Sequence, residues 1–188
     1  MIPLFDVRKS KKTPYITISL IIINVVLFSV FKDSLISLYG FIPGEFSFFH
    51  ILTAMFLHTS IFHLLFNMWF LWIFGDNVEG KIGHLKFLFF YLFSGIMAAL
   101  IYSLFGENLS IPVVGASGAI SGVLGAYLIL FPKNKLRVFP NFTFPSFLYI
   151  ILWFLLQLLF VYLGEGGIAY IGHISGFITG LILILFLK

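Results

Sequence analysis

The 188-residue chain is too apolar for a soluble domain, since 61% of its residues are hydrophobic, 10% are charged and 26 are Phe. A single core cannot cover that much apolar surface, so lipid must cover the remainder. The absence of Cys excludes disulfide bonds, thiolate metal sites and Cys nucleophiles, and the net charge of +4 is informative mainly through its position along the chain.

Six segments reach or approach the roughly 17–25 apolar residues that a helix needs to cross a bilayer. They lie at residues 14–31, 58–75, 84–105, 112–131, 143–163 and 168–187. We find no internal repeat and no low-complexity linker between them. The sequence therefore predicts an all-α, multi-pass membrane protein, with one domain at residues 1–188, a bundle of six transmembrane helices and a short basic N-terminus at residues 1–13.

The 11 lysines and arginines cluster on one side of the predicted spans. Ten of them precede the first span, lie between the second and third or the fourth and fifth spans, or follow the sixth: Arg8, Lys9, Lys11, Lys12, Lys81, Lys86, Lys133, Lys135, Arg137 and Lys188. Lys32 is left for the opposite side. The positive-inside rule then predicts that both termini and the second and fourth connections are cytoplasmic.

The connection at residues 32–57 is unusually apolar for an exposed loop. Seven large apolar residues lie on either side of Pro43-Gly44: Phe41, Phe46, Phe48, Phe49, Ile51, Leu52 and Phe56. This pattern is typical of short helices that lie in the membrane interface, and it also fits a loop that packs on the bundle.

Four polar side chains fall at a similar depth in three of the spans. Ser117 lies about five residues, or ~7–8 Å, into the fourth span, and His173 lies at a similar depth in the sixth. In the second span His63 is followed one turn deeper by Asn67, on the same face. Because polar groups in a bilayer are costly, their convergence on one layer indicates a functional site.

The residue types in that layer suit nucleophilic catalysis. A serine hydroxyl becomes a good nucleophile when a base takes its proton, and the ring of His173 is suited to that task. His63, Asn67 and the backbone N–H of Ser117 can donate to an oxyanion, which the start of a helix also favours. Since this layer has no carboxylate to orient His173, the sequence predicts a Ser-His dyad.

Two stripes of glycine explain how the fourth and sixth spans could approach each other. They are formed by Gly118, Gly122 and Gly125 in the fourth span and by Gly172, Gly176 and Gly180 in the sixth. Small residues at this spacing let membrane helices pack closely. We therefore expect these two spans to touch, and we assign the stripes to packing.

Three motifs together resemble those of a known family. They are His63-Leu64-Leu65-Phe66-Asn67, Gly115-Ala116-Ser117-Gly118, and Gly172-His173 with Gly176 and Gly180, in spans two, four and six. In this order, and with the predicted topology, they resemble a rhomboid intramembrane serine protease from about Tyr15 to the C-terminus. The resemblance implies Ser117 as nucleophile, His173 as base, and His63 and Asn67 with Gly115 near the oxyanion.

The resemblance also implies a fold and a substrate class. The fold is a six-helix bundle around a water-accessible cavity that opens to the outside, with the first loop embedded laterally in the membrane. Glu79, at the cytoplasmic end of the second span, takes a structural role. The implied partners are membrane lipid and single-span transmembrane proteins, cut near the outer face at small residues, and no metal or other cofactor is required.

Two positions depart from the family pattern. Ser121 stands where many members have a Tyr that packs against the catalytic histidine, so we expect another group, such as a Phe ring, to orient His173. Phe49-His50 stands where a Trp-Arg pair is often found, so the anchoring of the first loop is expected to differ.

The sequence gives less support to other functions than to a protease. A transporter would need a polar path to the inner face, and span four below Ser121 reads as nearly continuous apolar sequence. A non-catalytic membrane chaperone on the same fold remains an alternative. A zinc protease is not supported, because the sequence lacks a His-Glu-x-x-His motif. Nucleic-acid binding has no support either.

The side chains of Asn24 and Gln157 are interpreted as making interhelical hydrogen bonds, and His50 and His84 are interpreted as solvated residues at the membrane surface. A prokaryotic plasma membrane is the expected location.

Overall fold

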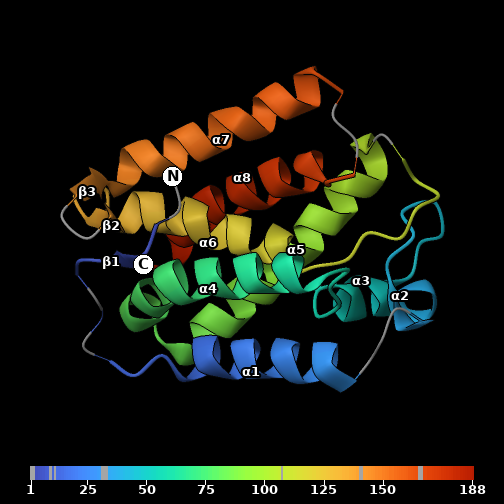
Figure 1. Cartoon of the computed structure of the whole chain (residues 1–188), viewed down its shortest axis with the longest axis horizontal. Coiled ribbons are helices and arrows are strands. Elements are labelled where there is room, and N and C mark those ends of the chain that lie inside the picture. The colour runs from blue at the N-terminus through green and yellow to red at the C-terminus, as the bar shows by residue number, and fades with distance from the viewer. Residues whose placement is uncertain are drawn as a thin grey trace.

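The computed structural model describes residues 3–8, 10, 12–30, 34–106, 108–139, 142–164 and 167–188 as a mostly helical protein (Figure 1). The helices of this part of the chain are α1 (Tyr15–Val30), α2 (Ser34–Tyr39), α3 (Phe48–Ala54), α4 (Ile61–Ile82), α5 (His84–Phe105), α6 (Ser117–Leu130), α7 (Ser146–Tyr162) and α8 (Tyr170–Leu187). Its strands, β1 (Phe5–Asp6), β2 (Lys135–Phe139) and β3 (Phe142–Pro145), form an antiparallel sheet in the order β1-β2-β3.

Apolar helices occupy the six segments that were predicted to span a membrane. Within the described ranges, α4, α5 and α8 are long and apolar enough to cross a bilayer, with 22, 22 and 18 residues. The helices α1, α6 and α7 are apolar but shorter, with 16, 14 and 17 residues. The prediction of a helical, apolar bundle is thus confirmed, and three of its helices have the length of a full span.

The two ends of the bundle differ in composition. The sheet, the C-terminus and the turn between α4 and α5 lie at one end, and α2 and α3 lie at the other (Figure 1). Lys81 and Lys86 flank the α4–α5 turn, so they share the end that carries the sheet. Lys32, the cation predicted for the opposite end, falls outside the described residues, as do Lys9 and Lys11.

The small sheet departs from the all-α prediction. Leu136 and Val138 of β2 are buried whereas Lys135 is exposed, which is the alternation that a strand with one covered face requires. The N-terminal β1 pairs with β2 on one side, placing Asp6 opposite Leu136, and β3 pairs with it on the other. The strands are so short that their period-two signal is weak beside the adjoining apolar helices.

The helix α6 lies at the centre of the bundle, packed against α4, α5 and α8. It begins at Ser117 rather than at residue 112, because the preceding residues are held in an irregular segment. There Val113 pairs with Phe41 through two backbone hydrogen bonds, and Gly115 has a φ of 122°, which a residue with a side chain rarely adopts. Such backbone is tolerated within a membrane protein where protein buries it or where it lines a cavity.

The glycine stripes bring α6 and α8 into backbone contact. A Cβ added to Gly176 would overlap the carbonyl oxygen of Gly118, and one added to Gly180 would overlap that of Gly122. Gly172 lies in the same row, with a Cβ position 3.9 Å from the carbonyl oxygen of Ala98 on α5. The two helices can approach this closely because no side chain stands between them.

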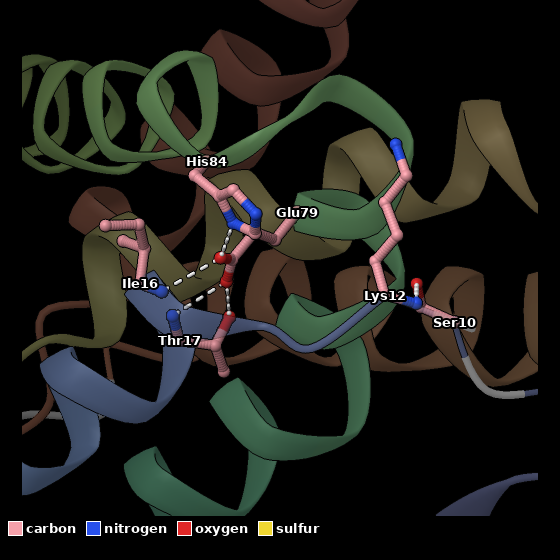
Figure 2. Close-up of polar contacts among 6 residues, drawn as sticks. All are labelled: Ser10, Lys12, Ile16, Thr17, Glu79 and His84. Atoms are coloured by element: carbon pink, nitrogen blue, oxygen red, sulfur yellow. Dashed lines mark hydrogen bonds and ion pairs between the residues drawn. The ribbon is translucent and has the colours of Figure 1, made fainter.

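The helix α4 continues to Ile82, beyond the predicted end at residue 75, and carries Glu79 into the core (Figure 2). The buried Glu79 carboxylate accepts hydrogen bonds from the backbone N–H groups of Ile16 and Thr17, at 2.8 and 2.7 Å, and from the Thr17 hydroxyl at 2.7 Å. These N–H groups belong to the first turn of α1, which has no intrahelical acceptor for them. Glu79 therefore caps α1 from a neighbouring helix.

His84 completes this cluster. Its Nδ1 lies 2.6 Å from Oε1 of Glu79 (Figure 2), and the centroid of its ring lies 5.4 Å from that of the Tyr15 ring. His84 is solvated, as expected, since its side chain is 41% exposed, and it also pairs with a buried carboxylate, which the sequence did not predict. The pair also links the starts of α1 and α5.

A second buried carboxylate lies at the same end of the molecule. Asp6 is 2% exposed and accepts hydrogen bonds from the amides of Asn77 and Asn134, at 2.7 and 3.0 Å, and from the hydroxyl of Tyr127. Its other oxygen accepts from the backbone N–H of Arg8 at 2.9 Å. The N-terminal strand is thereby joined to α4, to α6 and to the segment that leads into β2.

The first long connection contains the short helices α2 and α3. Phe46, Phe48 and Phe49 are exposed, whereas Phe41 and Ile51 are buried against α5. The segment therefore combines both readings of its sequence: short helices with an outward apolar face, and an inward face packed on the bundle.

Candidate active site

Ser117 and His173 face each other across the contact between α6 and α8. Ser117 is the first residue of α6, His173 lies in the first turn of α8, and Oγ of the serine is 2.8 Å from Nε2 of the histidine. The close packing of Gly176 against the carbonyl group of Gly118, which follows Ser117, sets the distance between α6 and α8 near these two residues. The geometry suits transfer of the serine proton to the ring.

Three groups surround the His173 ring. Oε1 of Gln157 on α7 lies 2.8 Å from Nδ1, and the rings of Trp153 and Tyr170 each lie 6.3 Å away, at interplanar angles of 33° and 90°. The expectation of a Phe ring in this place is wrong in detail, since a Trp and a Tyr take it. Ser121 is buried and donates to the Ser117 carbonyl of its own helix at 2.7 Å.

The two amides predicted to link helices behave differently. Gln157 does link α7 to α8, as predicted, through its contact with His173. The sequence did not predict that His173 would be the partner. Asn24 instead donates to the carbonyl of Leu20 in its own helix at 2.8 Å, which corrects the interhelical expectation. In the sequence, both residues are single amides in an apolar helix and look alike. Only the packing of the helices shows which amide bonds to a neighbouring helix.

His63, Asn67 and Gly115 gather beside the serine. A Cβ added to Gly115 would lie 2.7 Å from Nε2 of His63 and 3.8 Å from Nδ2 of Asn67, so the glycine leaves room for both side chains. Nδ1 of His63 lies 3.2 Å from the Thr59 hydroxyl, and Asn67 donates to the carbonyl of His63 at 3.1 Å. The amide of Asn67 keeps a second N–H for another acceptor.

These groups line one cavity with a volume of about 780 Å³. Its wall includes all five predicted residues: His63, Asn67, Gly115, Ser117 and His173. Along α6 toward the sheet, the wall of the cavity ends at Leu124. About one turn further, the ring of Tyr127 packs edge-on against that of Phe74 at 5.0 Å, and both rings are fully buried. This apolar layer separates the cavity from the Asp6 cluster.

A metal centre finds no support in the part of the chain that the structure describes. Within it, no group of three or more His, Cys, Asp or Glu side chains is placed to hold a metal ion. His58, beside His63 with a ring separation of 5.0 Å, is buried in an aromatic contact.

A helical bundle whose described residues include three helices long and apolar enough to cross a bilayer, and many large apolar side chains exposed on its surface, has the character of a membrane protein. A model of the Rhomboid domain matches residues 45–188. The chain is 34% identical over 161 residues to Rhomboid protease GluP of Bacillus subtilis, a match that covers 84% of this chain and 28% of that protein. The chain belongs to the rhomboid family, whose members are integral membrane proteins, as the apolar helices require.

Relatives from other organisms match a similar region. RHOMBOID-like protein 4 of Arabidopsis thaliana is 34% identical over 137 residues, covering 71% of this chain and 32% of that protein. Rhomboid protein 1, mitochondrial, of Saccharomyces cerevisiae is 32% identical over 141 residues, covering 70% and 40%. The chain therefore matches less than half the length of each of these relatives.

Proposed function

We propose that this chain is an intramembrane serine protease that hydrolyses peptide bonds of membrane proteins, with Ser117 as nucleophile and His173 as general base. The observation that carries the proposal is the 2.8 Å distance between Oγ of Ser117 and Nε2 of His173 inside a cavity of an apolar bundle. The match to a named protease of the family supports it.

The reaction proceeds in two halves through an acyl-enzyme. In the first, Nε2 of His173 takes the proton of Ser117 as Oγ attacks the scissile carbonyl carbon. The C–N bond then breaks, and His173 gives the proton to the leaving amine. In the second, a water molecule gives a proton to His173 and attacks the ester, the C–O bond to Ser117 breaks, and the proton returns to Oγ.

The tetrahedral intermediates of both halves carry an oxyanion that needs donors in place beforehand. If the Thr59 hydroxyl donates to Nδ1 of His63, as their 3.2 Å distance allows, then Nε2 of His63 carries the hydrogen and can donate into the cavity. The second N–H of Asn67 and the free N–H groups at the start of α6 complete the set. Gly115 leaves the space in which the oxyanion is held.

We further propose that all six apolar helices cross the membrane and that the cavity opens to the outside. The cationic connections at the sheet end then face the cytoplasm, as the positive-inside rule requires. The short α6 reaches the outer surface through the irregular residues before Ser117, which line the cavity. Water enters from that side and reaches Ser117 without passing through lipid.

The proposed substrates are single-span transmembrane proteins. A cavity among the helices can hold an extended backbone, so a substrate helix must unwind where it is cut. The walls near Ser117 are formed in part by Ala98, Ala99 and Gly118, which suits a small substrate side chain beside the scissile bond. Lipid covers the outward faces of the bundle.

The test is cleavage of a fluorescent single-span substrate by the protein purified in detergent. We expect cleavage by the parent and none by Ser117→Ala or His173→Ala, with both variants retaining the thermal unfolding of the parent. Cleavage that survives Ser117→Ala would overturn the mechanism. Binding of the substrate without cleavage by the parent would instead favour a non-catalytic membrane chaperone.

A further inference from the structure

The environment of His173 contains a group that the dyad does not account for. A histidine that accepts a proton on Nε2 must carry its own hydrogen on Nδ1, and in many sites a partner of Nδ1 enforces this tautomer. In this chain the partner is an uncharged amide, Oε1 of Gln157, at 2.8 Å. Gln157 is buried, at 7% exposure, in a helix whose neighbouring residues are largely apolar.

The orientation of the Gln157 amide follows from its second contact. Nε2 of Gln157 lies 3.4 Å from the carbonyl oxygen of Trp153, one turn earlier in α7. A carbonyl oxygen can only accept, so the amide nitrogen must face it and the amide oxygen must face His173. An amide oxygen can only accept in turn, and therefore Nδ1 of His173 bears the hydrogen.

We propose that Gln157 is the positioning residue of the site, which holds His173 in the tautomer and rotamer that can take the proton of Ser117. The chain of contacts runs from Trp153 O through the Gln157 amide and the His173 ring to Oγ of Ser117, with each donor facing an acceptor. The ring of Trp153 lies against one side of His173, so two residues of α7 fix the same imidazole. This role rests on the proposed function, because positioning His173 affects the reaction only if Ser117 is the nucleophile.

The inference also explains why Ser121 is compatible with an ordered site. Ser121 is bonded to its own helix and leaves the orientation of His173 to α7. Without Gln157, the ring is free to place its hydrogen on Nε2, where it cannot accept the serine proton. Ser117 and His173 would then still be neighbours, but His173 would often be in the tautomer that cannot accept the serine proton.

The variants that test this are Gln157→Met, which keeps the size and removes the acceptor, and Gln157→Glu, which keeps an acceptor for Nδ1–H. Asn24→Leu is the matched control, because Asn24 is also a buried amide bonded to the carbonyl four residues earlier, but it lies on α1. We expect Gln157→Met to lower kcat about threefold to tenfold with little change in KM, Gln157→Glu to react faster than Gln157→Met, and Asn24→Leu to keep the parent kcat.

A second measurement reads the tautomer directly. In protein labelled with 15N-histidine, long-range proton–nitrogen spectra in detergent distinguish Nδ1–H from Nε2–H, and His173 is assigned by its loss in His173→Ala. We expect the Nδ1–H form in the parent and a mixture in Gln157→Met, whether or not the protein cleaves the substrate offered. An Nε2–H form in the parent, or an unchanged tautomer and kcat in Gln157→Met, would overturn the role of Gln157. Failure of the parent to react with a fluorophosphonate probe at Ser117 would count against the proposed function instead.

Discussion

Gly176 on α8 lies against the backbone carbonyl of Gly118 on α6, with no room between them for a methyl group. The contact stands one residue from Ser117 along α6 and three residues from His173 along α8. The packing of α6 on α8 and the proposed chemistry therefore depend on the same distance between the two helices. A change at Gly176 is expected to reach the reactive pair without touching it.

We predict that Gly176→Ala lowers the free energy of unfolding by about 1–3 kcal/mol, because overpacking against backbone forces the helices apart. Cleavage should fall as well, since separation of α6 from α8 lengthens the distance from Ser117 to His173. Thermal unfolding and substrate cleavage in detergent measure both effects. Ile182→Phe, which adds bulk on the exposed face of α8, serves as the control. Parent-like stability of Gly176→Ala would remove the packing argument.

We predict that His63→Ala and Asn67→Ala each lower kcat by up to about 10²–10³, the loss that follows removal of an oxyanion donor. Proton transfer from Ser117 to His173 should change little, because neither His63 nor Asn67 is bonded to His173 in the structure. Steady-state kinetics with the single-span substrate give the comparison. A raised KM at unchanged kcat would assign these residues to substrate binding.

We predict that Glu79→Ala lowers the free energy of unfolding by about 3 kcal/mol or more, since three buried donors at the start of α1 each lose an acceptor at about 1 kcal/mol or more. Glu79→Gln should lower the free energy of unfolding by less, because its amide keeps one acceptor oxygen. Thr17→Val measures the contribution of the Thr17 hydroxyl alone. Chemical denaturation in detergent ranks the variants. A loss in Glu79→Ala no greater than that in Thr17→Val would mean that the backbone N–H groups find other acceptors.

We predict that Asp6→Ala frees the N-terminal strand. The amides of Asn77 and Asn134 would lose a shared acceptor, and the β1–β2 pairing is too short to hold on its own. Limited trypsin digestion should then cut after Arg8 faster than in the parent, as mass spectrometry can follow. Asp6→Asn, which keeps one acceptor oxygen, should be cut at an intermediate rate. Equal cutting of all three proteins would show that the strand is held by other contacts.

The sequence predicted the helices best where a turn residue marks their ends. The predicted span at 84–105 coincides with α5, which follows Gly83 and ends before Gly106. The predicted start of the fourth span was wrong, because apolar residues continue through Pro112 into a segment whose backbone is bonded to Phe41 rather than to itself. Hydropathy counts apolar residues and carries no information on where such tertiary pairing replaces a helix.

For the candidate site, the motifs predicted which residues meet but not what holds them. Ser117, His173, His63 and Asn67 could be placed in one layer from their depth in the spans alone. The contact of Gln157 with His173 depends on the rotation of α7 about its axis, which a nearly uniform apolar helix does not encode. The same limitation applies to Asn24, whose amide turns back on its own helix.

The Asp6 cluster also bears on the order in which the protein is assembled. During synthesis Asp6 is made before its partners, because the Tyr127 hydroxyl and the Asn134 amide that bond to it are 121 and 128 residues further along the chain. Until α6 has been made, the donors available to this carboxylate in the structure are the Arg8 N–H and the Asn77 amide. The contacts of β1 are thus completed only after the central helix of the bundle has been made, and docking of β1 reports that this helix is in place.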